Sequence, residues 1–252
     1  TLATYSYELN NKKAPFDNVN VRKALNLSLD RNVITDKVLG QGQTPTYVFT
    51  PTYIEEGQLI QQPAYSKEPM AQRNEEAIKL LEEAGYSKAN PLKFSILYNT
   101  NENHKKVAIA AASMWKANTK GLIDVKLENQ EWKTYIDSRR AGRYDAARAG
   151  WNADYNQATT FGNYFLSNSS NNTAKYANPE YDKAIAESYV ATDAEGRAKA
   201  YAKAEEILAK DFGIVPIFNY VNPRLVKPYV KGYSGKDPQD HIYLRNLYII
   251  KH

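Results

Sequence analysis

The chain has 252 residues, with 33 lysines and arginines against 28 aspartates and glutamates, which gives a formal net charge of +5. Its length predicts one large domain or two small ones, and a hydrophobic share of 42% excludes an intrinsically disordered chain. The sequence contains no cysteine, which excludes thiol catalysis, cysteine-ligated zinc, iron–sulfur clusters and disulfides. No apolar run is long enough to cross a bilayer.

The basic excess makes a nucleic-acid or other polyanion-binding module one alternative function. However, the basic residues are dispersed among acids, which is more typical of a solvated surface. The 20 tyrosines are the unusual feature, because a flat ring with a hydroxyl suits surfaces that bind polar ligands without strong selectivity. The chain opens on Thr1 in a strand-like segment, which indicates a processed or truncated product.

The N-terminal part predicts a strand, then helices separated by an ordered loop. Residues 18–38 have apolar side chains at helical spacings, with a break at which Asp30 caps a second helix. Gly40 and Gly42 follow the end of that helix. Residues 44–64 contain three prolines and no periodicity, which predicts an ordered loop. Residues 70–84 predict a helix that ends at Gly85.

The clearest unit is a strand over residues 92–98, a helix over 104–118 and an alternating strand over 123–127. Strand, helix and strand at this spacing predict a βαβ unit with parallel strands. A short helix over residues 131–140 and a buried strand over 144–151 follow.

The later part of the chain predicts helices over residues 180–190 and 193–211, with Thr192 and Glu195 at the spacing of a capping box. Residues 214–220 predict a strand in which Pro216 requires an edge position or a bulge. Residues 247–251 predict a last strand. The whole pattern is α/β with a mixed sheet.

Most common catalytic and cofactor motifs are absent from the sequence. The three histidines do not lie at metal-ligand spacing, and neither a hydrolase elbow nor a phosphate-binding loop occurs. Gly40-Gln41-Gly42 follows a helix and lacks a third glycine, so a dinucleotide site is not expected. No cofactor or metal is predicted. A hydrolase with paired carboxylates stays open, because such pairs need only spatial proximity; the candidates are Glu128, Glu131, Asp145 and Asp154.

Residues 144–156, YDAARAGWNADYN, are dense in groups that bind polar ligands. A charge at Arg148 inside a strand is costly unless it is paired or faces a cleft. Gly150 permits close backbone approach, and Trp151 supplies a ring face. Asp154 follows the strand, where ligand contacts gather in α/β sheets. A structural Arg148–Asp154 pair is the alternative, and the residues alone leave the two explanations about equal.

This segment resembles the signature of the periplasmic oligopeptide-binding proteins, the solute-binding family that serves peptide ABC importers. The resemblance covers the whole chain in order. It extends through YELNNKK (7–13), YNT (98–100), HKK (104–106), NQEWKT (129–134), LSNSS (166–170), RLVKP (224–228) and the C-terminal YIIKH (248–252).

The resemblance implies a periplasmic-binding-protein-like (class II) lobe, with a mixed sheet flanked by helices, from a two-lobed protein. Residues 2–220 would form the C-terminal lobe, and residues 221–252 a returning tail that completes an N-terminal lobe absent from this chain. It further implies a monomeric, non-enzymatic, exported periplasmic protein whose signal peptide lies upstream. Its partners would be short peptides and the membrane subunits of an ABC importer, and not nucleic acid.

The resemblance also assigns roles in peptide binding. Asp154 matches the carboxylate for the peptide α-ammonium, and Arg148 and His104 match groups that meet the peptide carboxylate. Gly150 and Asn152 would offer backbone groups, and Trp151 and Trp132 would wall side-chain pockets. Further candidates are Tyr220, Tyr7, Glu8, Arg139 and Arg140. For Arg139 and Arg140, the sequence context favours a solvated helix face over a role in binding.

The chain departs from the family pattern in a cysteine pair and in a lysine. Many relatives carry a cysteine pair, which Ala3 and Asn152 replace here, so both partners are lost together. The segment at Leu39–Gly40 lacks a lysine that some relatives use for peptide carboxylates, so the preferred peptide length is open. A branch of the family prefers murein peptides, and this ligand is a second alternative.

Overall fold

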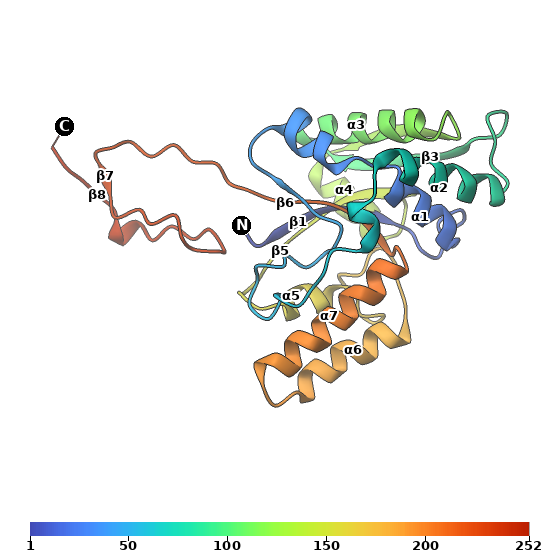
Figure 1. Cartoon of the computed structure of the whole chain (residues 1–252). Coiled ribbons are helices and arrows are strands. Elements are labelled where there is room, and N and C mark those ends of the chain that lie inside the picture. Colours follow the sequence, from blue (N-terminus) through green and yellow to red (C-terminus); the bar gives the residue numbers. More distant parts are fainter. Residues whose placement is uncertain (252) are drawn as a thin grey trace.

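In the computed structural model, which describes residues 1–251, the chain forms a six-stranded mixed sheet with helices on both sides (Figure 1). The strand order is β2-β6-β1-β5-β3-β4. β1 (Ala3–Leu9) runs antiparallel to β5 (Ala146–Asn152) and to β6 (Ile214–Asn219). β3 (Leu92–Asn99) runs parallel to β4 (Ile123–Gln130) and to β5. The predicted mixed sheet and the parallel βαβ unit are therefore confirmed.

The helices gather in two groups, one above and one below the sheet as it is drawn in Figure 1. The upper group consists of α1 (Val19–Leu27), α2 (Met70–Glu83) and α3 (Glu102–Asn118). The lower group consists of α5 (Thr159–Gly162), α6 (Pro179–Val190) and α7 (Ala194–Lys210). α4 (Trp132–Arg140) follows β4, and single 3₁₀ turns span Ala64–Lys67, Asn163–Phe165 and Leu244–Asn246.

The side chains of β1 alternate between the two faces of the sheet, and helices pack against both faces. Tyr5, Tyr7 and Leu9 belong to a core shared with α1, α2 and α3. A second core is built mainly from α5, α6 and α7, and Ile214 of β6 joins it. Successive side chains of a strand point to opposite faces, so a strand in the middle of this sheet contributes to both cores.

Two helices differ from the sequence prediction. The second helical segment of residues 18–38 is a π-helix, Val33–Leu39. Asp30 accepts a hydrogen bond from the amide of Asn32 at 3.0 Å just before this helix, and Gly40, with φ of 62°, follows its end. The capping residue of α7 is Asp193, whose carboxylate accepts from the amide of Gly196 at 2.7 Å. The capping box predicted at Thr192 is therefore wrong, because the next residue has the extended backbone and the acceptor that the helix start needs.

Pro216 lies at a bulge, as predicted. The register of β1 against β6 shifts between Tyr5 and Ser6, so that these two residues face Phe218 and Pro216. β6 is not an edge strand, because the two-residue β2 (Thr44–Pro45) pairs with its far end.

The residues after β6 leave the sheet as an extended tail, drawn in red in Figure 1. β7 (Val230–Lys231) and β8 (Tyr248–Ile249) pair with each other in a separate two-stranded sheet. The predicted strand over residues 247–251 is thus only two residues long. Several apolar tail side chains are exposed, among them Leu225, Leu244 and Ile249.

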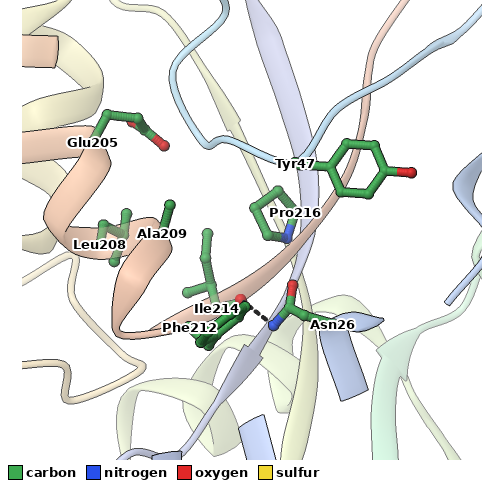
Figure 2. A pocket seen from close by; sticks show the side chains of 8 residues that line it. All are labelled: Asn26, Tyr47, Glu205, Leu208, Ala209, Phe212, Ile214 and Pro216. Carbon is green, nitrogen blue, oxygen red and sulfur yellow. Dashed lines mark hydrogen bonds between the residues drawn. The ribbon is translucent and has the colours of Figure 1, made fainter. Parts of the chain in front are cut away.

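The loop over residues 44–64 is tied to α7 beside a small closed pocket (Figure 2). Buried Glu205 accepts hydrogen bonds from the amides of Phe49 and Thr50 and from the Thr50 hydroxyl. On the other side of the pocket, Asn26 donates to the carbonyl of Ile214 at 3.0 Å. The volume is about 10 Å³, which holds one water and no larger ligand.

Candidate functional site

The polar segment predicted from the sequence lies on β5, next to the central strand β1. Cross-strand pairing sets Tyr7 opposite Arg148 and Tyr5 opposite Gly150. Residues directly opposite each other in an antiparallel pair point to the same face. Arg148 and Gly150 therefore share the face of the sheet on which α3 begins.

Arg148 is held by tyrosines and not by a carboxylate. Its Nη2 donates to the hydroxyl of Tyr220 at 2.5 Å, and the guanidinium lies 5.2 Å from the ring centre of Tyr5. Burial alone lowers the pKa of Arg148, but the neighbouring tyrosine hydroxyls, with Tyr220 the foremost, more than offset this and the pKa is raised. Arg148 therefore remains a cation with room for one more acceptor.

Gly150 leaves the space that the ends of the Arg148 and Tyr220 side chains occupy. A Cβ atom at this position would lie 2.9 Å from Arg148 Nη2 and 2.9 Å from the Tyr220 hydroxyl. The close approach predicted at Gly150 thus occurs within the protein, and it involves two side chains and not a backbone.

A pocket of about 290 Å³ opens beside this cluster. Two polar atoms near it, Nδ1 of His104 and Nε of Arg148, are buried and have no hydrogen-bond partner among the described residues. The pocket is lined by Tyr5, Leu39, Gln41, Gln43, Asn101, Asn103, His104, Val107, Phe218, Tyr220, Val221, Asn222 and Pro223.

His104 reaches this pocket from the first turn of α3, and its ring centre lies 5.6 Å from that of Tyr5. Burial, together with the charge of Arg148, lowers the pKa of His104 to about 3. An imidazole in this position is neutral at physiological pH. It can offer a hydrogen bond to a carboxylate, but not a positive charge.

Asp154 lies two residues beyond the end of β5 and is exposed. Its carboxylate forms no ion pair with any residue in the described range, and the hydrogen-bonding partner of Arg148 is Tyr220. The structural Arg148–Asp154 pair considered above is therefore absent from residues 1–251. An unpaired carboxylate at a strand end is available to an external cation.

The two tryptophans occupy different settings near this strand end. Trp151 is half-buried, donates through Nε1 to the hydroxyl of Thr160 at 3.3 Å, and packs edge-on against Tyr164. Trp132 begins α4 with 57% of its surface exposed, and it stacks on Tyr135 at 5.8 Å between ring centres. Asn152 is exposed and lies opposite Ala3.

Three of the predicted site residues do not line the pocket beside Arg148. Tyr7 is completely buried in the core against Trp115. Glu8 is 1% exposed and pairs with Arg139 at 3.0 Å, and it also accepts from Tyr164. Glu8 lies on the opposite face of β1 from Tyr7, so strand alternation directs it away from the pocket. These contacts give Glu8 and Arg139 a structural role, whereas Arg140 is exposed at the end of α4.

Three of the four candidate carboxylates already have partners within the protein. Glu128 contacts Lys126 at 3.8 Å, Glu131 accepts from Thr100 at 3.0 Å, and Asp145 contacts Lys13 at 2.6 Å. Glu128 and Asp145 line one open pocket beside β3 and β4, and each contacts a lysine.

Sequence reasoning missed several residues of the site. Tyr5, Gln41, Gln43 and Asn103 line the pocket, and none of them was a predicted site residue. Two-residue spacing from Tyr7 could have identified Tyr5. No local signal identifies Thr160, whose contacts depend on the fold.

In residues 1–251 no group of three potential ligands could hold a metal ion. Over the same range, no helix is both long and apolar enough to cross a membrane.

The chain belongs to the bacterial extracellular solute-binding proteins, family 5, whose middle-region model matches residues 1–173. Over 252 residues it is 97% identical to the periplasmic oligopeptide-binding protein OppA of Haemophilus influenzae. It is 55% identical to OppA of Salmonella typhimurium and 44% identical to the periplasmic murein peptide-binding protein MppA of Escherichia coli, each over 251 residues. These matches cover 100% of this chain but only 46% or 47% of each relative, so the chain spans about half of their length.

Solved structures agree with this family assignment. The crystal structure of Haemophilus influenzae OppA in complex with RPPGFSPFR matches with a TM-score of 0.94 at 96% identity, covering 100% of this chain and 49% of that one. The Escherichia coli murein tripeptide binding protein MppA matches with a TM-score of 0.91 at 44% identity and the same coverage. The fold is thus that of the family 5 periplasmic binding proteins.

Proposed function

We propose that this chain is the ligand-binding C-terminal portion of a periplasmic oligopeptide-binding protein, which captures short peptides and delivers them to an ABC importer. One observation carries the proposal: the unpaired carboxylate of Asp154 ends the same strand that holds the cation Arg148 beside an open pocket. A peptide is the ligand that offers an ammonium at one end and a carboxylate at the other. The peptide named in the complex of the 96% identical structure supports this ligand class.

The spacing of the two charges suits an extended peptide. Arg148 and Asp154 are six positions apart, which corresponds to at most about 20 Å of extended chain. Gly150 and Asn152 lie between them and would pair with the ligand backbone, while Trp151 and Trp132 would contact its side chains. Pairing through the backbone gives affinity that depends little on the peptide sequence.

The carboxylate end of the peptide would meet Arg148 as the charged group, with neutral His104 as a hydrogen-bond partner. The hydroxyl of Tyr220 holds the Arg148 guanidinium in place by accepting its hydrogen bond. Charge-assisted hydrogen bonds of this kind are about twice as strong as neutral ones.

We further infer that residues 2–220 form one lobe and that the tail, residues 221–252, joins a second lobe supplied by the rest of the protein. The exposed apolar side chains of the tail support this division, because such side chains normally pack against a partner. The monomeric state, the importer membrane subunits as partners and a periplasmic location reached through an upstream signal peptide belong to the same proposal.

The test uses a chimaera in which this chain replaces the 97% identical segment of the Haemophilus influenzae relative. Calorimetry compares a tripeptide that has a free N-terminus with its N-acetylated form. We expect the free form to bind more tightly, and Asp154→Asn to weaken its binding about 100-fold, because the ammonium loses its counter-charge. Asp124→Asn, an exposed carboxylate of β4, is the matched control and should have no effect.

Equal binding of the free and acetylated peptides would remove the assigned role of Asp154. A murein tripeptide forms a third arm of the experiment, and a clear preference for it over ordinary tripeptides would replace the general peptide proposal with the murein alternative. Absence of binding to all three ligands would contradict the proposed function.

A further inference from the structure

The hydroxyl of Thr160 contacts both Trp151 and Asp154 at the end of β5. Its Oγ1 accepts from the amide of Asp154 at 3.1 Å and from Nε1 of Trp151 at 3.3 Å. The hydroxyl proton points toward Oδ2 of Asp154 at 3.5 Å, the limit of hydrogen bonding. A hydroxyl has one donor and two acceptor positions, so these three contacts use its full capacity.

The short helix that carries Thr160 is firmly packed. All four residues of α5 are buried, and Thr160 itself is 4% exposed. A Cβ atom on Gly162 would lie 2.7 Å from Ile185, so α5 approaches α6 as closely as a glycine allows. Tyr181 of α6 also donates to the carbonyl of Gly162 at 2.7 Å.

The carboxylate of Asp154 is exposed and lies outside regular structure, and Thr160 is the buried side chain that contacts both the amide and the carboxylate of Asp154. An exposed side chain in a turn has many rotamers, and restricting them before the ligand arrives reduces the entropy cost of binding. The same hydroxyl accepts a hydrogen bond from the Trp151 ring, so the Asp154 carboxylate and the Trp151 ring keep fixed positions relative to each other.

We propose that Thr160 is a positioning residue for the ammonium site: its buried hydroxyl fixes the Asp154 turn and the Trp151 ring as one preorganised unit. This inference rests on the proposed binding of a peptide ammonium by Asp154. It assigns the preference for free over blocked N-termini in part to a residue that does not touch the ligand.

The test measures, in the chimaera, the ratio of dissociation constants for the acetylated and the free tripeptide. Thr160→Val keeps the shape of the side chain and removes the hydroxyl, and we expect it to lower this ratio about tenfold. Thr160→Ser restores the hydroxyl and should restore the ratio. Binding of the acetylated peptide should stay within about threefold of the parent, because this ligand does not engage the Asp154 carboxylate as an ammonium does.

Thr159→Val is the matched control. Thr159 is the neighbouring buried threonine, and its hydroxyl contacts Gln157 and Tyr201 but not Asp154. A general loosening of α5 would appear in both valine variants, whereas the proposed role predicts a change only for Thr160. If valine prevents folding, Thr160→Ala removes the same hydroxyl in a smaller side chain.

An unchanged ratio in a folded Thr160→Val or Thr160→Ala variant overturns the inference, provided that the parent chimaera discriminates between the two peptides. An equal fall of the ratio in Thr159→Val also overturns it. Failure of the parent to bind either peptide contradicts the proposed function itself, so the two failures are distinguishable.

Discussion

Arg148 and His104 lie around one pocket, but the two side chains carry only one positive charge between them. The proximity of Arg148 and the burial of the ring make protonation of His104 unfavourable. The folded state therefore holds a neutral imidazole over the range in which a free histidine titrates. The proposed carboxylate site consequently has nearly constant charge between pH 5 and pH 8.

The lowered pKa of His104 predicts how the stability of the fold changes with pH. The unfolded chain binds a proton at His104 below about pH 6.5, whereas the folded chain does so only near pH 3. The stability contributed by the neutral ring is therefore present above pH 6.5 and is lost as the pH falls toward 3. We expect His104→Gln to reduce the loss of stability between pH 7 and pH 4.5, as measured by urea unfolding. An imidazole NMR signal of His104 that titrates like N-acetylhistidine amide would contradict this.

The Glu8–Arg139 pair is a structural element of the second face of the sheet. Removing one member of a buried ion pair leaves an uncompensated charge. We expect Arg139→Met to lower the free energy of unfolding by about 3–5 kcal/mol, and Glu8→Gln in the same chain to recover part of the loss. Arg140→Met, a change at the exposed neighbour, should alter stability by less than about 0.5 kcal/mol.

Denaturant unfolding measures these differences, and the preference for free over acetylated peptide should be unchanged in all three variants. A selective loss of peptide binding in Arg139→Met at normal stability would return Arg139 to the candidate site.

At this scale, sequence reasoning identified the residues of β5 better than those of β1. Arg148, Gly150 and Asp154 are consecutive features of one segment, and their types alone indicate polar binding. Glu8 and Tyr7 are polar residues of a buried strand, and their environment depends on helices far along the chain. A residue type indicates what a side chain can do, but only packing decides which face it occupies.

The pairing of β1 with β5 joins the start of the chain to the candidate site. Ala3 lies directly opposite Asn152. The amide of Ala153 donates to the carbonyl of Leu2 at 2.8 Å, which extends this pairing beyond the strand ends. Backbone pairs therefore join β1 to the strand end that precedes Asp154.

A disulfide should fit between these two positions. We expect Ala3→Cys together with Asn152→Cys to oxidise readily, because directly opposed residues in an antiparallel pair have Cα atoms at a suitable distance. The bridge should raise the free energy of unfolding by about 2–4 kcal/mol. Thermal unfolding with and without a reductant measures this, with each single cysteine variant as a control. Free thiols that persist under oxidising conditions would show that the predicted proximity is wrong.

The helices and strands were largely predictable because their periodicities are strong, and the parallel pairing of β3 with β4 follows from the βαβ unit. The strand order was not predictable, since β1 pairs with strands that begin more than a hundred residues later. The π-helix at Val33–Leu39 also has no distinct sequence signal, because its apolar spacing is close to that of an α-helix.

Over the whole molecule, the tail leaves the sheet beside the pocket, which Val221, Asn222 and Pro223 help to line. Gln239 of the tail donates to the carbonyl of Asp154 at 3.0 Å, so the tail still contacts the ammonium turn. A closed binding site buries most of a small ligand, and a single surface cannot do so.

The isolated chain should therefore bind peptide poorly. We expect the 252-residue chain to bind the free tripeptide at least about 100-fold more weakly than the chimaera, as measured by calorimetry. A cooperative thermal transition monitored by circular dichroism would serve as the control that the chain is folded. Equal affinity of the chain and the chimaera would mean that one lobe is sufficient for binding.

The size of the pocket, about 290 Å³, has a thermodynamic consequence. The part of such a pocket that a ligand does not fill holds water, so each ligand side chain displaces a different number of waters. A large side chain gains contact enthalpy and apolar burial, while a small one leaves ordered waters in place. A series of peptides should therefore show widely varying enthalpies and heat-capacity changes, yet nearly level free energies of binding.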